Sequence, residues 1–357
     1  MRFFKHALYT TLLLASTGLM SLSAAANVVI LQYHHVSETT PRVTSVTPEE
    51  LRQHMRYLTE NDFKVIPLAQ AVDAFQNDNA DSLPDKAVVI TFDDGYQNVF
   101  DYAAPILKEF NLPYTVFVNP RLLANHDFYM GWDELRQLQQ QGALIVNHSQ
   151  SHQHLIRRLA DENEQQWQQR VSDDISSAQQ AIDDALGQQP KYFAYPYGEY
   201  SPALETLLQE MGYVAFGQHS GPWGKYTPLT AIPRFPASGR YASLDTLKTK
   251  LLSLAMPVTE VKPEQSLLAP DQVKPELQVT LANSDDMRNS QLQCFAGAEV
   301  LAPTWLSATQ FTVKPREALG IGRSRYNCTA PSESHAGRYY WYSKPFIRTD
   351  SKGNWPD

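Results

Sequence analysis

The chain has 357 residues, of which 43% are hydrophobic and 19% are charged. This length is comfortable for two domains and this composition can bury a core, which excludes an intrinsically disordered protein. The formal net charge is −8 and the sequence has no basic or arginine-rich run, so the electrostatic footprint of a nucleic-acid-binding protein is missing.

The N-terminus has the pattern of a secretory signal peptide. Arg2 and Lys5 form a short positive region, an apolar run covers residues 7–22, and the small residues 23–26 form a cleavage site. The apolar run is short for a bilayer span and no second one follows, so we expect cleavage after Ala26 and no stable membrane insertion. An uncleaved membrane anchor is the alternative. The mature chain is expected to be exported to the periplasm or the extracellular space.

From residue 27 to about residue 254, short apolar runs alternate with stretches of helical periodicity. Predicted strands cover residues 28–31, 87–92, 114–118, 144–146, 192–195 and 213–216. Predicted helices cover residues 48–58, 97–110, 132–141, 161–185 and 201–210. This alternation predicts an α/β fold with a mostly parallel, barrel-like sheet, in which reactive residues lie at the C-terminal ends of the strands.

Residues 256–274 are rich in proline and are predicted to be a linker. Beyond them, strand patterns at 277–281, 310–313 and 339–342 are separated by turns. Residues 275–357 are therefore predicted to form a small β-sandwich-like accessory domain, for glycan binding or for packing against the first domain.

The chain has two cysteines, Cys294 and Cys328, both in this last region. In an oxidising compartment they are expected to form one disulfide that closes a loop of about 34 residues. Two unrelated buried thiols are the alternative.

Two adjacent carboxylates, Asp93 and Asp94, follow the predicted strand 87–92 and are followed by Gly95. Neighbours on a strand point to opposite faces, but glycine permits a bend that brings both carboxylates to one rim. One carboxylate can then bind a cation while the other accepts a proton. An ordinary acidic turn after a strand is the alternative.

His148 and His152 follow another predicted strand, and a spacing of four lets them converge on one metal ion if the segment makes a helical turn. Asp94, His148 and His152 are therefore predicted to bind one divalent metal ion with open positions for water and substrate. Zinc is expected, and cobalt or nickel would also fit. Asp93 is the predicted general base. His154 is expected to face elsewhere.

The order Thr91-Phe-Asp-Asp-Gly95, then His148-Ser-x-x-His152, resembles the NodB-type polysaccharide deacetylases of carbohydrate esterase family 4. The resemblance covers roughly residues 27–250. It implies a distorted (β/α)7 barrel, which we assign to residues 27–255, with the small β domain behind it. It also implies that the first aspartate is the base and that the second binds the metal with both histidines.

The third family motif, Arg-x-Pro-Tyr, reads Ala194-Tyr-Pro-Tyr197 here, so its arginine is absent. By resemblance, the backbone N–H of Tyr197 stabilises the oxyanion. The family arginine holds the catalytic base, and we expect Arg234 to supply that contact from a neighbouring strand. A solvated loop arginine is the alternative for Arg234.

The family also uses a histidine to protonate the leaving amine, in a downstream Leu-x-His motif that this chain lacks. Leu31-Gln-Tyr-His34 instead resembles the circularly permuted deacetylases of the poly-N-acetylglucosamine type, in which a Leu-x-Tyr-His segment near the start supplies it. We assign His34 as the acid and His35 as its structural neighbour. His219, which also follows a strand, is the second candidate.

The resemblance predicts a metal-dependent hydrolase that removes N-acetyl groups from an amino-sugar polysaccharide or oligosaccharide and releases acetate. An O-acetyl esterase, a non-catalytic glycan-binding protein and an envelope assembly factor are the alternatives. Chitin oligomers, poly-N-acetylglucosamine and peptidoglycan all fit as substrates. Aromatic side chains that could stack on sugar rings are expected in or near the rim loops; they are Tyr96, Trp132, Tyr195, Tyr197, Tyr200 and Trp223.

Overall fold

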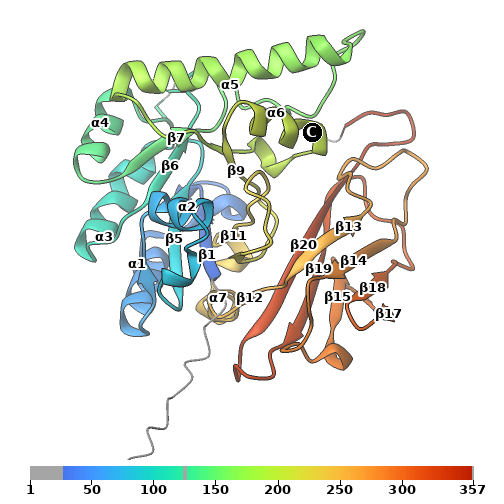
Figure 1. Cartoon of the computed structure of the whole chain (residues 1–357). Helices are drawn as coiled ribbons and strands as arrows, with labels where there is room; N and C mark the ends of the chain where they lie inside the picture. The colour runs from blue at the N-terminus through green and yellow to red at the C-terminus, as the bar shows by residue number, and fades with distance from the viewer. Residues whose placement is uncertain (1–26, 124–126, 356–357) are drawn as a thin grey trace, which may run out of the picture.

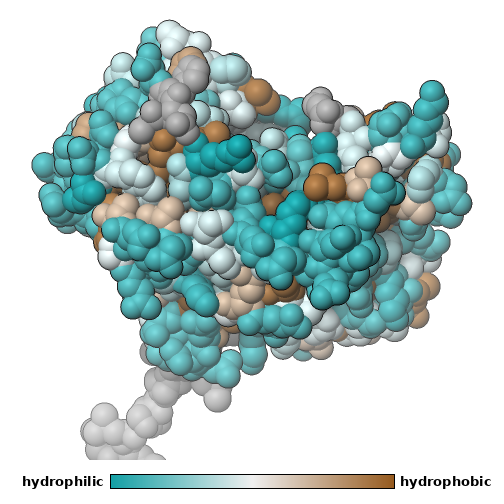
Figure 2. Space-filling view, turned by 90° about the horizontal axis from the view of Figure 1, so that it is seen from above, coloured by the Kyte–Doolittle hydropathy of each residue, from teal (hydrophilic) through white to brown (hydrophobic). Residues whose placement is uncertain are grey.

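The computed structural model describes residues 27–123 and 127–355. The predicted signal peptide, residues 1–26, lies outside the described residues. In the part that is described, no helix has the length and apolar character needed to cross a membrane. An α/β part and an all-β part lie side by side (Figure 1). The face seen from above is mostly hydrophilic, with hydrophobic residues in small groups (Figure 2).

The α/β part is built on a curled, mostly parallel sheet with the strand order β10-β1-β5-β6-β7-β8-β9. The strands of this path are β1 (Asn27–Tyr33), β5 (Ala87–Phe92), β6 (Thr115–Val118), β7 (Leu144–Asn147), β8 (Tyr192–Ala194), β9 (Val214–Phe216) and β10 (Trp223–Gly224). Strand β10 is antiparallel to β1, and the short strand β4 (Lys64–Val65) pairs with β5. Each strand predicted for this part of the chain is present, with its ends shifted by a few residues at most.

Seven α-helices are seen in the described part of the chain: α1 (Pro48–Glu60), α2 (Leu68–Gln76), α3 (Ala104–Glu109), α4 (Trp132–Gln140), α5 (Glu164–Leu186), α6 (Pro202–Glu210) and α7 (Leu244–Leu251). Helices α1, α3 and α4 lie on the side away from the all-β part, and α5 runs across the top (Figure 1). The predicted helix 97–110 is divided into a π-helical turn, Val99–Ala103, and α3. Helices α2 and α7 were not predicted.

The two edges of the curled sheet are joined by residues 229–236. The Ile232 carbonyl accepts a hydrogen bond from the Gly217 N–H, just after β9. A few residues later, β11 (Phe235–Pro236) pairs with β1 in parallel. This extended segment therefore connects β9 to β1, and the predicted barrel-like α/β fold is confirmed.

The all-β part contains two further sheets. One has the order β12-β20-β19-β15-β16 and the other the order β13-β14-β18-β17. Their strands are β12 (Leu254–Ala255), β13 (Val258–Lys262), β14 (Leu277–Leu281), β15 (Gln293–Ala296), β16 (Glu299–Leu301), β17 (Thr304–Ser307), β18 (Gln310–Val313), β19 (Gly322–Pro331) and β20 (Tyr339–Arg348). Side chains from both sheets share one buried core, so the predicted C-terminal sandwich is confirmed.

The predicted disulfide is present inside this core. Cys294 on β15 and Cys328 on β19 are directly opposite each other in the sheet, with Cα atoms 4.0 Å apart, and both are fully buried. The alternative of two unrelated thiols is therefore wrong.

The segment predicted to be a linker contains strand β13, which pairs antiparallel with β14. Its prolines Pro257 and Pro263 flank the strand and do not interrupt it, which is a position that proline tolerates. Strand β12 also joins the sheet of β20. We call residues 27–253 the barrel and residues 254–355 the β module.

Candidate active site

One open cleft at the C-terminal ends of the barrel strands is lined by several of the predicted site residues. Asp94 follows β5, His152 lies in the loop after β7, and His34 directly follows β1. The cleft has a volume of about 570 Å³ and is lined by residues of both the barrel and the β module. The structure therefore brings together residues from distant parts of the chain.

The backbone turns sharply after β5. Asp94 and Gly95 both have left-handed backbone angles, with φ of 71° and 74°. A Cβ atom on Gly95 would lie 3.1 Å from Val118 Cγ1, so the turn also needs the small residue. Because two residues adopt this conformation, Asp93 and Asp94 do not follow strand alternation and both reach the site.

Asp94, His148 and His152 form a compact cluster. One oxygen of Asp94, Oδ1, lies 3.2 Å from His148 Nε2 and 3.2 Å from His152 Nε2. The three candidate ligand atoms all lie within 4.8 Å of one another. His148 is fully buried, and its Nδ1 donates a hydrogen bond to the Ala194 carbonyl at 2.8 Å. This bond leaves the Nε2 lone pair of His148 free to bind a metal ion.

The two histidines converge without the helical turn that their spacing suggests. Residues 148–152 form an irregular loop in which Ser149 and His152 have positive φ angles of 69° and 52°. The Ser149 side chain accepts a hydrogen bond from the His152 N–H at 2.9 Å, and Asp174 accepts one from Ser151 Oγ at 2.6 Å. These polar contacts hold the loop in its irregular conformation. The helical turn is therefore absent, but both histidines still point at Asp94.

The donor set of this cluster fits a divalent metal ion. Asp94 Oδ1 and His148 Nε2 are buried and have no hydrogen-bond partner among the described residues. Buried polar atoms without partners are costly, and a cation between them would satisfy both. Burial alone would raise the pKa of Asp94, but His148 and His152 hold it well below its ordinary value, so the carboxylate is ionised.

Asp93 is fully buried and is held by charged and polar donors. Arg234 donates two hydrogen bonds to its carboxylate, from Nη1 to Oδ1 at 2.7 Å and from Nη2 to Oδ2 at 2.8 Å. Gln32 Nε2 donates a third, to Oδ2, at 2.7 Å. Arg234 is itself fully buried and its Nε donates to the Gly217 carbonyl, so it is not a solvated loop arginine.

These contacts keep Asp93 ionised. Burial would raise the pKa of Asp93, but Arg234, together with His148 and His34, lowers it below its ordinary value. A carboxylate offers about four acceptor positions, and the three donors from Arg234 and Gln32 leave one of them free. Asp93 can therefore accept a further proton or hydrogen bond.

His34 and His219 differ in their surroundings. His34 Nε2 lies 3.9 Å from Asp93 Oδ2, its side chain is 20% exposed, and it faces the cleft. His219 is only 9% exposed, and burial, with nearby Lys344, lowers its pKa to about 3. A histidine with so low a pKa is neutral near pH 7, so it does not carry the proton that a general acid must donate. The geometry favours His34.

Tyr197 is positioned by its neighbours at the mouth of the cleft. Its backbone is left-handed, with φ of 59°. The His154 ring stacks on the Tyr197 ring with centroids 3.7 Å apart, and His154 Nδ1 lies 2.7 Å from Glu199 Oε2. As expected, His154 is outside the Asp94 cluster.

Sequence reasoning missed the wall of the cleft that the β module supplies. Arg323 on β19 donates a hydrogen bond to the Tyr197 carbonyl at 3.4 Å, and its guanidinium lies 5.2 Å from the Tyr197 ring centroid. Arg325, on the same strand, donates to the Gln218 carbonyl at 3.2 Å. Gln32 was also missed, although a polar residue inside an apolar strand is a signal that could have found it.

The aromatic residues expected at the rim divide into two groups. Tyr96, Tyr197 and Tyr200 line the cleft. Tyr195 and Trp223 are fully buried, and Trp132 packs against the barrel core. The expectation is therefore wrong for Tyr195 and Trp223, whose side chains pack in hydrophobic core clusters of the barrel.

Residues 80–216 match the family model described as polysaccharide deacetylase. YxkH of Bacillus subtilis is 27% identical over 188 residues, which are 53% of this chain and 63% of YxkH. The poly-beta-1,6-N-acetyl-D-glucosamine N-deacetylase of Escherichia coli K12 is 23% identical over 242 residues, with 58% of this chain and 36% of that protein covered. The matched regions are thus less than two thirds of either relative.

Among solved structures, the Streptococcus pyogenes deacetylase PplD, in complex with acetate, is similar with a TM-score of 0.57. The sequence identity is 19%, and the similarity covers 64% of this chain and 99% of the PplD chain. This likeness concerns the fold of the barrel.

Proposed function

Because residues 80–216 match the polysaccharide deacetylase family model, we propose that the chain is a metal-dependent hydrolase that removes N-acetyl groups from an amino-sugar polysaccharide and releases acetate. One observation carries the proposal. The cluster of Asp94, His148 and His152 lies beside a buried, ionised Asp93 at one end of an open cleft. A metal site next to a held carboxylate is suited to attack by water on an acyl group.

Asp94, His148 and His152 would hold the ion, and an ion with this donor set is expected to be zinc, with cobalt or nickel as substitutes. In that position a divalent ion would polarise the acetamide carbonyl and lower the pKa of a water molecule. The remaining steps belong to side chains and backbone groups of this chain.

Asp93 acts as the general base in this proposal. Arg234 and Gln32 fix the orientation of its carboxylate, and the free acceptor position takes the proton of the attacking water. Asp93 is fully buried, so bulk water does not compete for these hydrogen bonds. Arg234 thus replaces the arginine that is missing from the Ala194–Tyr197 segment.

The Tyr197 N–H and His34 complete the reaction. The N–H is proposed to donate to the oxyanion that forms as the carbonyl carbon becomes tetrahedral. His34, which faces the cleft, is proposed to protonate the departing amine, so that the carbon–nitrogen bond breaks and acetate leaves. An amine is a poor leaving group without this proton, whereas an ester alkoxide needs it less.

We further propose that the chain is exported and acts on an extracellular or periplasmic glycan. The signal-peptide pattern of residues 1–26 supports export. The Escherichia coli relative is named for poly-beta-1,6-N-acetyl-D-glucosamine, which makes that polymer the first candidate among chitin oligomers, poly-N-acetylglucosamine and peptidoglycan.

The test is acetate release from these three glycans and from an O-acetylated xylan, before and after chelation and after zinc is added back. The proposal expects release from at least one N-acetylated glycan, loss on chelation and recovery with zinc. Release from the O-acetylated substrate alone would make the chain an esterase. Tight glycan binding without release from any substrate would make it a binding protein.

A further inference from the structure

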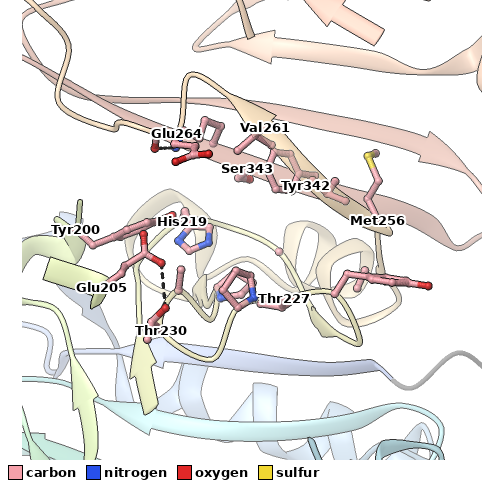
Figure 3. Close-up of a pocket in the computed structure, with 18 of the residues that line it drawn as sticks. Tyr200, Glu205, His219, Thr227, Thr230, Met256, Val261, Glu264, Tyr342 and Ser343 are labelled. Carbon is pink, nitrogen blue, oxygen red and sulfur yellow. Dashed lines mark hydrogen bonds between the residues drawn. The ribbon is translucent and has the colours of Figure 1, made fainter. Parts of the chain in front are cut away.

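A second pocket lies between the barrel and the β module. It has a volume of about 430 Å³, within the roughly 300–1,000 Å³ range of small-molecule sites. Barrel residues Tyr200, Glu205 and His219 line one side, and Trp341, Tyr342 and Lys344 of β20 line the other. We call it the interdomain pocket. In Figure 3 the barrel residues and the β-module residues face each other across open space.

The interdomain pocket adjoins the active-site cleft. Tyr200 and His219 line both cavities, so these two side chains form a shared wall. A ligand that occupies the cleft and extends past this wall would reach the interdomain pocket. Polymers can do this, whereas a single sugar unit cannot.

Opposite charges face each other across the pocket without pairing. Glu205 Oε2 accepts a hydrogen bond from Thr230 Oγ1 at 3.1 Å, and Lys344 Nζ donates one to the Glu264 carbonyl at 2.6 Å. Burial raises the pKa of Glu205 and lowers the pKa of Lys344 to about 8. Both groups keep unused hydrogen-bonding capacity beside the pocket. No ion pair joins them among the described residues.

His219 adds a buried polar group to this wall. The residue is 9% exposed, and its Nδ1 has no hydrogen-bond partner among the described residues. Nδ1 packs against Gly217, where a Cβ atom would lie 2.6 Å away. The ring lies beside the Tyr200 ring, with centroids 5.4 Å apart, on the opposite side of the pocket from Ser343 (Figure 3). Together, His219, Glu205 and Lys344 offer a ligand in the pocket both hydrogen-bond donors and acceptors.

Aromatic side chains surround these polar groups. Tyr200, Trp341 and Tyr342 contribute rings to the lining, and Tyr226, which is 41% exposed, lies on the rim. Flat rings beside a carboxylate and an ammonium group suit a pyranose, whose C–H faces are apolar and whose hydroxyl groups both donate and accept. An apolar ligand would not use the remaining hydrogen-bonding capacity of Glu205 and Lys344.

We propose that the interdomain pocket is a second saccharide-binding site, which takes a hexosamine unit of the same polymer whose acetylated unit lies in the active-site cleft. Hydroxyl groups of this unit donate to Glu205 and accept from Lys344. The polymer part of this inference rests on the proposed function, because that function places the reacting sugar in the adjoining cleft. The β module thereby gains a role in binding long substrates.

The test is calorimetric binding to the metal-loaded full chain carrying Asp93→Asn, so that the ligand is not hydrolysed. The probes are N-acetylglucosamine pentamers with β-1,4 or β-1,6 linkages, their fully de-N-acetylated forms, and the corresponding dimers. Adding Glu205→Gln or Tyr226→Ala to this chain is expected to weaken pentamer binding about tenfold. The first variant loses one charged hydrogen bond to the sugar, and the second loses one stacked ring. Dimer affinity is expected to change much less.

The chain supplies two matched controls. Glu210→Gln makes the same change at an exposed position of helix α6 outside the pocket, and Tyr339→Ala removes a tyrosine that is 40% exposed on β20. Neither is expected to change pentamer affinity by more than about twofold. The pentamer that depends most on Glu205 identifies the unit as acetylated substrate or as deacetylated product.

The outcomes separate this inference from the proposed function. Acetate release by the native chain, with equal pentamer affinity in all variants, would overturn the second site alone. Glu205-dependent pentamer binding without any acetate release would support the site and reject the deacetylase. If no pentamer binds, or if the control variants weaken binding as much as the pocket variants, the second site is rejected.

Discussion

The two walls of the active-site cleft differ in how tightly their charged groups are held. On the barrel wall, Arg234 is fully buried and makes two short hydrogen bonds to a buried carboxylate. On the β-module wall, the Arg323 side chain is 52% exposed and reaches Tyr197 through one long hydrogen bond. Buried, saturated groups keep one geometry, whereas exposed ones adjust to what they contact. Under the proposed function, we therefore expect the barrel to determine the chemistry and the module to influence substrate binding.

The largest effect is expected at the metal cluster of the barrel wall. His148→Ala removes one of three ligands, and the loss of several kcal/mol of transition-state stabilisation corresponds to a fall in kcat/KM of about 10³-fold or more. Bound zinc, measured by mass spectrometry, is expected to disappear with the activity. His335→Ala, in the β module, serves as the control. A His148→Ala protein that retains stoichiometric zinc and activity would rule out the cluster as the metal site.

The next largest effect concerns the acid. His34→Ala is expected to lower kcat by about 10²-fold, which is the lower range for loss of a general acid or base. His219→Ala is expected to change kcat on a disaccharide by only a few fold, because its ring is buried and neutral. Steady-state acetate release measures both. The opposite ranking of the two variants would assign the acid to His219.

A smaller loss is expected for Arg234→Lys. Lysine keeps the positive charge but cannot make the two parallel hydrogen bonds to Asp93, so we expect kcat to fall about tenfold and Tm to decrease. Arg240→Lys is the control, because it makes the same arginine-to-lysine change at an exposed position a few residues later. Unchanged kcat in Arg234→Lys would mean that Asp93 does not need the bidentate contact.

The smallest effect is expected on the module wall. Arg323→Ala removes a partly exposed contact to Tyr197, so KM is expected to rise about threefold while kcat stays within about twofold. Arg316→Ala, at a side chain that is 85% exposed, is the matched control. A fall in kcat as large as that of Arg234→Lys would show that the two walls do not divide binding from chemistry.

Local sequence patterns were sufficient to predict the carboxylates and histidines of the barrel wall, although not Gln32. Asp93, Asp94 and His148 directly follow apolar strands, His152 lies in the loop after one of them, and the C-terminal ends of parallel strands meet at one edge of a sheet. The backbone conformation of the loops that carry these residues could not be predicted from the sequence. The left-handed angles at Asp94 and His152 depend on tertiary contacts, and neither residue type signals them by itself.

The module wall could not be predicted, because its contacts depend on how the barrel and the β module pack against each other. Arg323 meets Tyr197 across 126 positions of sequence, and no motif around Arg323 indicates that contact. Helix α2 was missed because it begins after Pro67 without a side-chain cap. Strand β13 was missed because Pro257 and Pro263, which border it, are typical of a linker.

Strand β20 is close to the C-terminal end of the described chain, yet it borders both cavities. It supplies Phe346 to the cleft and Tyr342 to the interdomain pocket, and it also pairs with β12. One strand therefore forms part of the wall of both cavities, so a shift of β20 would change the shape of the cleft and of the interdomain pocket together.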